Sequence, residues 1–114
     1  MVSSFDHKVM LIKLTQDVDA GDPDALYAAT RAWWKVAEKR RSGAAESPEI
    51  ALAVRDGVVV GAYEIDGWRG PGGPEGDRWA FDGHRRGALD ERYVGVDVSD
   101  HYPRGAQNPV RYVL

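Results

Sequence analysis

The chain contains no cysteine, which excludes disulfide bonds and thiolate metal sites and makes a cytoplasmic location the expectation. It also has no apolar run approaching the ~20 residues needed to cross a bilayer. Asp6, His7 and Lys8 interrupt any apolar stretch near the N-terminus. We therefore expect neither a membrane span nor a secretory signal.

Recognisable catalytic and metal-binding spacings are lacking as well. His7, His84 and His101 lie far apart in the sequence and show no zinc-binding spacing. There is no nucleophile elbow, Walker loop or dinucleotide fingerprint. Arg69 and the glycines after it do not open a helix that would bind phosphate. We expect no metal and no cofactor.

The composition fits one folded domain spanning residues 1–114, because 43% of the residues are hydrophobic and four are tryptophans. The net charge of -3 argues against tight, sequence-independent binding to a nucleic-acid backbone. An acidic cluster nevertheless precedes a basic one: Asp17, Asp19, Asp22 and Asp24, then Arg31, Lys35, Lys39, Arg40 and Arg41. The basic residues can meet phosphate locally. The same order also suits the dipole of a single helix.

Hydrophobic patterning predicts one long helix and several short strands. Asp22 as N-cap and Pro23 in the first turn begin the helix, which we expect to run to about Arg41. Asp56-Gly57 predicts a hairpin turn. The predicted strands are 8–14, 50–55, 58–65, 78–81, 93–95 and 110–113. The other predicted features are an exposed loop at 67–77, a solvated segment at 84–91 and a helical turn at 96–102.

The expected helix carries two adjacent tryptophans. Helical spacing places an apolar stripe against the sheet, formed by Leu26, Ala29, Thr30, Trp33 and Ala37. A neighbouring stripe is rotated away from the core, formed by Tyr27, Arg31, Trp34, Glu38 and Arg41. Helical neighbours point ~100° apart, so one tryptophan must face another element or a ligand.

One strand, a long helix and then hairpin-linked strands form an α+β pattern. We expect about five or six strands in a curled sheet that closes toward a small β-barrel, with the helix at an opening.

Three stretches carry a family resemblance: the Trp-Trp pair of the helix, the hairpin run Tyr-Glu-Ile-Asp-Gly-Trp with Arg-Trp-Ala-Phe-Asp-Gly after it, and the terminal Asn-Pro loop and strand. In this layout the chain resembles the PUA-like superfamily, and most of all its small EVE and ASCH-type domains. The resemblance implies a small pseudo-barrel with a pocket lined by aromatic and polar loop residues. Members bind RNA, modified bases in DNA or nucleotide-like molecules, and a minority are enzymes.

A base-binding pocket needs flat apolar surfaces and hydrogen-bonding groups for base edges. The stacking candidates are Trp34, Trp79, Phe81 and Tyr102. Gln107 and Asn108 offer carboxamides for base edges, and Gly105 allows close backbone approach. The candidates for holding a phosphate are Arg31, Arg104 and Arg111. We therefore expect a nucleic acid or a nucleotide-like small molecule as the partner.

Other interpretations stay open. Trp79 and Phe81 share a strand face and suit core packing, while Asn108 suits a turn. The domain can instead be a small enzyme acting on a nucleoside-like or amide substrate. It can also be an interaction domain whose dimer face contains Trp34 and Tyr27.

Overall fold

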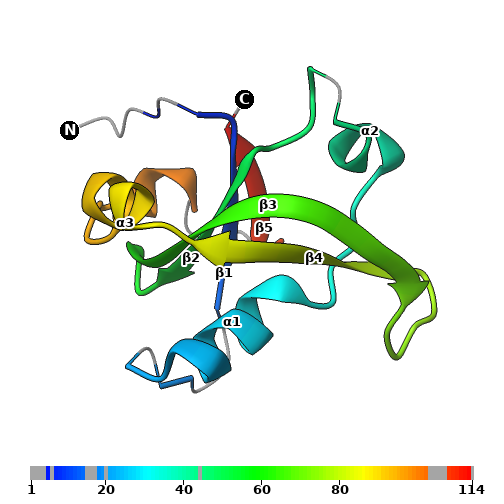
Figure 1. Cartoon of the computed structure of the whole chain (residues 1–114), viewed down its shortest axis with the longest axis horizontal. Helices are drawn as coiled ribbons and strands as arrows, with labels where there is room; N and C mark the ends of the chain where they lie inside the picture. The colour runs from blue at the N-terminus through cyan, green and yellow to red at the C-terminus, as the bar shows by residue number, and fades with distance from the viewer. Residues whose placement is uncertain are drawn as a thin grey trace.

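One mixed five-stranded sheet organises the molecule (Figure 1). The computed structural model describes residues 5, 7–14, 18–19, 21–43, 45–102 and 108–113. Its elements in chain order are β1 (Val9–Lys13), α1 (Pro23–Arg31), α2 (Glu38–Arg41), β2 (Ile50–Arg55), β3 (Val58–Gly72), β4 (Arg78–Arg85), α3 (Gly87–Tyr93), the 3-10 helix η1 (Ser99–His101) and β5 (Val110–Val113). The strand order is β4-β3-β2-β1-β5, with β1 and β2 parallel and the other neighbours antiparallel.

Both faces of the sheet are covered. Alternate residues of β1 point to opposite faces, and all of Val9, Met10, Leu11 and Ile12 are fully buried. The parallel pairing of β1 with β2 requires a crossover connection, and α1 lies in that connection, over the face that contains Met10. The helix α3 packs on the other face through Leu89 and other residues of the second core cluster.

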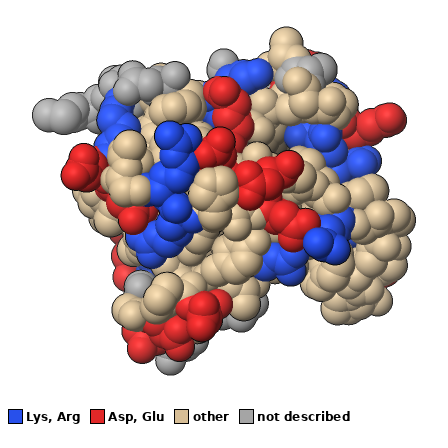
Figure 2. Space-filling view, in the orientation of Figure 1, with Lys and Arg blue, Asp and Glu red and all other residues tan. Residues whose placement is uncertain are grey.

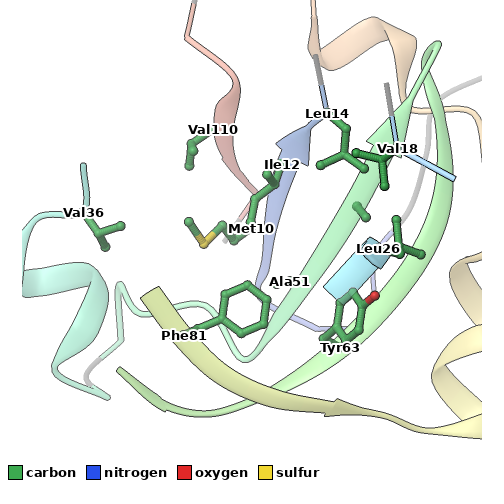
Figure 3. Packing of buried hydrophobic residues seen from close by; sticks show 11 residues of the cluster. Met10, Ile12, Leu14, Val18, Leu26, Val36, Ala51, Tyr63, Phe81 and Val110 are labelled. Carbon is green, nitrogen blue, oxygen red and sulfur yellow. The ribbon is translucent and has the colours of Figure 1, made fainter. Parts of the chain in front are cut away.

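The core on the α1 side is built largely from aromatic and long aliphatic side chains (Figure 3). Met10 of β1, Phe81 of β4 and Tyr63 of β3 lie around one interior, which the segment between α1 and β2 enters through Val36 (Figure 3). This segment therefore completes the core and is more than a connection.

Several local predictions are confirmed. The Asp22 carboxylate accepts hydrogen bonds from the backbone N–H groups of Asp24 and Ala25 at the start of α1. The Asp56-Gly57 turn has φ values of 53° and 79°, as a primed hairpin turn requires. The predicted strands at 8–14, 50–55 and 110–113 correspond to β1, β2 and β5, and the predicted turn at 96–102 contains η1.

The expected long helix is wrong beyond Arg31. Ala32 is extended, with φ -148° and ψ 157°. Trp34 then exchanges two backbone hydrogen bonds with Trp79 of β4, at 2.9 and 2.8 Å. A strand-like pairing thus replaces the helix, and only the four residues of α2 become helical again. Of the predicted apolar stripe, Trp33 and Ala37 are exposed, because the alternation of an extended chain replaces helical spacing.

Two other predictions also need correction, and a third is confirmed in part. The expected loop at 67–77 is in large part strand, because β3 continues to Gly72 in pairing with β4. The expected solvated segment at 84–91 is exposed at 84–88 and at 91, although it contains the end of β4 and the start of α3, whose Leu89 is buried. The expected strand at 93–95 begins with the last residue of α3, Tyr93, which is fully buried.

The α+β class is confirmed, but the sheet is open. Its two edge strands, β4 and β5, do not pair with each other among the described residues. The barrel closure expected from the sequence is therefore not made by strand pairing in this part of the chain.

Candidate functional site

The predicted site residues fall into two groups in the structure. One group surrounds the start of β4: Arg31, Trp34, Trp79 and Phe81. The second group lies at the opposite edge of the sheet, near β5: Tyr102, Asn108 and Arg111. Three further candidates lie outside the described residues: Arg104, Gly105 and Gln107.

The aromatic members of the first group are engaged within the fold. Phe81 is fully buried, and its ring lies edge-on to Tyr27 and Trp68. The indole N–H of Trp34 donates to the carbonyl of Thr30 at 2.8 Å. Core packing, which the sequence left open as an alternative, therefore accounts for Phe81.

The ring of Trp79 is covered on one face by the guanidinium of Arg41. The guanidinium carbon of Arg41 lies 3.6 Å from the ring centroid, within the range of a cation–π contact. The Arg41 Nε also donates to the carbonyl of Val36 at 3.1 Å. This face of Trp79 is thus already occupied by a side chain of α2.

Arg31 is committed to a carboxylate. Its Nη2 donates to Asp82 at 2.9 Å and its Nε donates to the carbonyl of Phe81 at 3.2 Å. Arg69 binds the second oxygen of Asp82 at 2.6 Å. Partial desolvation raises the pKa of Asp82, but the hydrogen bonds from Arg69 and Arg31 outweigh it and hold the pKa below its usual value.

The second group sits on the other face of the sheet. The Tyr102 hydroxyl donates to the carbonyl of Pro109 at 3.0 Å, and the ring packs with the α3-side cluster. Lys13 Nζ and the Arg111 guanidinium lie 5.7 and 6.0 Å from its ring centroid. Burial raises the pKa of Tyr102, and Arg111 lowers it in part. Asn108 accepts a hydrogen bond from the backbone N–H of Val110, as a turn residue does.

A different surface, which the sequence analysis missed, gathers an aromatic ring and several cations. In the extended segment after α1, Trp34 and Val36 turn toward the core, whereas Trp33 and Lys35 face outward. Trp33 is 40% exposed, an unusual state for so large a ring. A signal for this alternation was present in the sequence, where polar Lys35 stands between apolar Trp34 and Val36. The residues on both sides favoured a continuous helix, so the extended segment was not predicted.

Trp33 rests on a glycine platform. A Cβ atom added to Gly73 would lie 2.9 Å from the Trp33 Cγ, and one added to Gly72 would lie 3.2 Å from the far edge of the indole. Gly73 also has φ +78°, which side chains other than glycine rarely adopt. The hairpin between β3 and β4 therefore supports one side of the ring and leaves the rest exposed.

Lys35, two residues after Trp33, lines a pocket of about 420 Å³ between α2 and β5. We call it the cationic pocket; its walls include Lys35, Lys39, Arg40, Asp77 and Tyr112. The Arg40 guanidinium lies 4.3 Å from the centroid of the Tyr112 ring. Burial raises the pKa of Tyr112 and Arg40 lowers it in part, so the phenol stays neutral near pH 7. The pocket thus combines cations with a neutral aromatic wall.

A second pocket, of about 510 Å³, opens between the N-terminal segment and the middle of β3. We call it the acid–base pocket; its charged or titratable lining residues are His7, Lys8, Glu49, Glu64 and Arg86. A smaller hollow of about 150 Å³ shares four lining residues with it and contains Trp68 and Asp66.

A chain of ionic contacts starts at Glu64 and Arg86 in the lining of the acid–base pocket and continues to His84 and Asp66 outside that lining. Glu64 Oε2 lies 2.8 Å from Arg86 Nη1 and 3.5 Å from His84 Nε2. The other ring nitrogen of His84 lies 2.8 Å from Asp66. Antiparallel pairing of β3 with β4, which sets Glu64 opposite His84, creates this arrangement. Within the described ranges, no three His, Asp or Glu side chains are placed to hold a metal ion.

Compared with family models, curated proteins and solved structures, the chain matches none of them. No helix among the described residues is long and apolar enough to cross a membrane.

The proposed dimer face is occupied within the chain. The Tyr27 hydroxyl accepts the backbone N–H of Gly83 at 3.0 Å, and its ring packs against Tyr63 and Phe81. Trp34 packs against the same core cluster. Both rings are partly buried by their own domain.

Proposed function

We propose that the domain binds a nucleobase or nucleotide, free or within a single strand, at Trp33 and the cationic pocket. The observation that carries this proposal is the exposed Trp33 ring, which precedes Lys35 on the outer side of the same extended segment. Aromatic platforms next to cations are the general means of binding single-stranded nucleic acids.

The cations suit a phosphate. Lys35, Lys39 and Arg40 line one pocket, and a guanidinium or ammonium group forms strong hydrogen bonds to phosphate oxygens. Lys39 also lies 3.8 Å from Glu46, a pair exposed enough to exchange partners easily. Trp33 would stack on the base while the pocket holds the phosphate beside it.

The charge distribution favours a short ligand over a long backbone. The chain carries a net charge of -3. On the face shown in Figure 2, basic and acidic side chains alternate and form no extended basic surface. We therefore expect contact with about one to three phosphates, and stacking worth about 1–3 kcal/mol per base must supply much of the affinity.

The PUA-like architecture is part of the same proposal. Support comes from α2, which contacts both edges of the open sheet: Arg41 lies on Trp79 of β4 and Arg40 on Tyr112 of β5. A curled sheet whose gap is filled by this segment would be the pseudo-barrel that the resemblance implies. A modified base, flipped out of a duplex or in a single strand, is the ligand class we would test first.

The test is a titration of labelled single-stranded DNA octamers, plain and base-modified, and of mononucleotides. The logarithm of the association constant should fall linearly with the logarithm of the salt concentration, with a slope of about -0.7 for each phosphate contacted. Trp33→Ala should weaken binding about 5- to 150-fold, which corresponds to the loss of one stacked base. Lys35→Glu combined with Lys39→Glu should also weaken binding.

Arg92→Glu is the charge control, because Arg92 lies on α3, which Figure 1 shows on the opposite side of the molecule from α2. It should leave the affinity close to that of the unmodified protein. Absence of binding at high micromolar concentration, with unchanged tryptophan fluorescence, would overturn the proposal. So would an equal loss of affinity in Arg92→Glu.

A further inference from the structure

The acid–base pocket has no lining residue in common with the cationic pocket. Its side chains differ in kind as well. Residues that carry a carboxylate, a guanidinium, an ammonium group and an imidazole line one volume of about 510 Å³, within the range of small-molecule sites. Two carboxylates, those of Glu49 and Glu64, belong to its lining, whereas the lining of the cationic pocket has one, that of Asp77.

Glu64 is placed to accept a proton. Arg86 and His84 approach the same oxygen, Oε2, at 2.8 and 3.5 Å. These contacts orient the carboxylate and, within the described part of the chain, leave Oε1 for a ligand. The Glu64 side chain is 36% exposed, so the group is accessible from the pocket.

His7 is placed to donate a proton. Its Nδ1 lies 2.7 Å from the hydroxyl of Tyr93, a residue that is fully buried. This contact orients the imidazole and, among the residues that the structure describes, leaves Nε2 as the ring nitrogen that can face a ligand. Histidine is the side chain that most readily exchanges protons near neutral pH.

From this geometry we propose that the acid–base pocket cleaves RNA without a metal ion. A base, an acid and fixed cations are sufficient for transfer of a phosphoryl group to a neighbouring hydroxyl, because the nucleophile is already part of the substrate. RNA supplies that nucleophile as its 2′-hydroxyl, whereas DNA does not.

In the proposed step, the 2′-oxygen attacks the adjacent phosphorus and its proton passes to the Glu64 carboxylate. The bond between phosphorus and the 5′-oxygen breaks, and that oxygen takes the proton from Nε2 of the protonated His7. Arg86 and Lys8 stabilise the charge that builds on the phosphate oxygens. The products are a 2′,3′-cyclic phosphate and a 5′-hydroxyl end. Glu64 then releases its proton to solvent, and His7 takes up a proton from solvent.

His84 is a positioning residue in this scheme. It lies between Asp66 and Glu64 and is 51% exposed, so it bridges the two carboxylates at the pocket edge. His84→Gln should lower the cleavage rate less than Glu64→Gln. His84→Gln should also shift the acidic limb of the pH–rate profile. The reason is that His84 and Arg86 both contact the Glu64 carboxylate, which is the proton acceptor in this scheme.

The experiment incubates the full chain, in EDTA, with a labelled DNA strand that contains a single ribonucleotide, one strand for each of the four bases. At least one strand should be cut after the ribonucleotide, with a product mass that shows a 2′,3′-cyclic phosphate. The all-DNA strand should stay intact. Glu64→Gln and His7→Gln should each slow cleavage at least about 100-fold, while Glu91→Gln, an exposed glutamate on α3, should not.

Circular dichroism should show that each variant is folded; if Glu64→Gln is not, His7→Gln decides the outcome. Cleavage no faster than that of the Glu64→Gln preparation would overturn the proposal. Cutting of the all-DNA strand, or loss of cutting in EDTA, would overturn it too. A 2′-O-methyl strand cannot be cut, and loss of its binding in Trp33→Ala but not in Glu64→Gln would assign that binding to Trp33 and the cationic pocket, so either proposal can fail alone.

Discussion

The Arg41 guanidinium lies 3.6 Å from the centroid of the Trp79 ring and ties α2 to the edge strand β4. The same side chain donates to the carbonyl of Val36, the residue that enters the core from this segment. Arg41 therefore helps to hold the segment from 32 to 41 against the sheet, together with the backbone pairing of Trp34 with Trp79.

Removal of this contact should destabilise the fold. We expect Arg41→Ala to lower the free energy of unfolding by about 1–3 kcal/mol, because a cation–π contact and a hydrogen bond are lost. Denaturant unfolding measures the change. Lys39→Ala, whose side chain is 57% exposed, is the control and should change stability by less than about 0.5 kcal/mol. Equal effects of the two variants would contradict the role given to Arg41.

The glycine platform under Trp33 can be tested with two alanine substitutions. Gly73 and Gly76 both have φ +78°, but only Gly73 lies against the indole. Gly76→Ala should cost about 1–2 kcal/mol from backbone strain alone. Gly73→Ala should cost more and shift the tryptophan emission, because the added methyl displaces Trp33. Identical emission spectra for the two variants would show that the ring does not rest on Gly73.

Two substitutions of Phe81 distinguish a role in core packing from a role in ligand binding. The ring is fully buried among aromatic neighbours, so Phe81→Ala should lower the free energy of unfolding by about 3–5 kcal/mol. Phe81→Leu retains more of the packing and should stay folded, with nucleotide affinity close to that of the unmodified protein. A large loss of nucleotide affinity in a well-folded Phe81→Leu protein would indicate instead that Phe81 contacts the ligand.

Asp82 predicts a dependence of stability on pH. Its pKa in the folded protein is below the ordinary value of 3.8, so the native state binds the proton more weakly than the unfolded chain. The stability that Asp82 contributes is therefore present above pH 3.8 and is lost as the pH falls through its folded pKa. The stability gap between the unmodified protein and Asp82→Asn should close during acidification in a series of urea titrations.

The matched control for this series is Asp100→Asn, at an exposed aspartate in η1 far from the arginines that bind Asp82. The difference between its free energy of unfolding and that of the unmodified protein is the baseline with which the gap for Asp82→Asn is compared at each pH. A gap for Asp82→Asn that stays constant from pH 6 to pH 2.5 would show that the carboxylate gains nothing from Arg31 and Arg69.

Short-range features of this protein were predictable because neighbouring residues control them. Asp22 caps α1 with its own carboxylate, and the Asp56-Gly57 turn adopts the positive φ values that its residue types tolerate. The strand at 110–113 was equally clear from its apolar and aromatic residues. These features depend on chemistry within a few residues of the chain.

The candidate site was less predictable, because it depends on partners far away in the sequence. Trp34 leaves helical geometry because it pairs with Trp79, which lies 45 positions later, and this pairing turns Trp33 outward. Glu64 meets His84 only through the register of β3 with β4. No local pattern reports such a register.

The amino-acid sequence alone thus determined the α+β class, the start of the first helix and its cap, most of the strands and the exclusion of cysteine chemistry. Only the tertiary structure decided which tryptophan is exposed, which rings are core, and which charges share a pocket. The physical reason is that capping and turn preferences act between neighbours. Strand pairing and burial act between residues that meet only after the chain has folded.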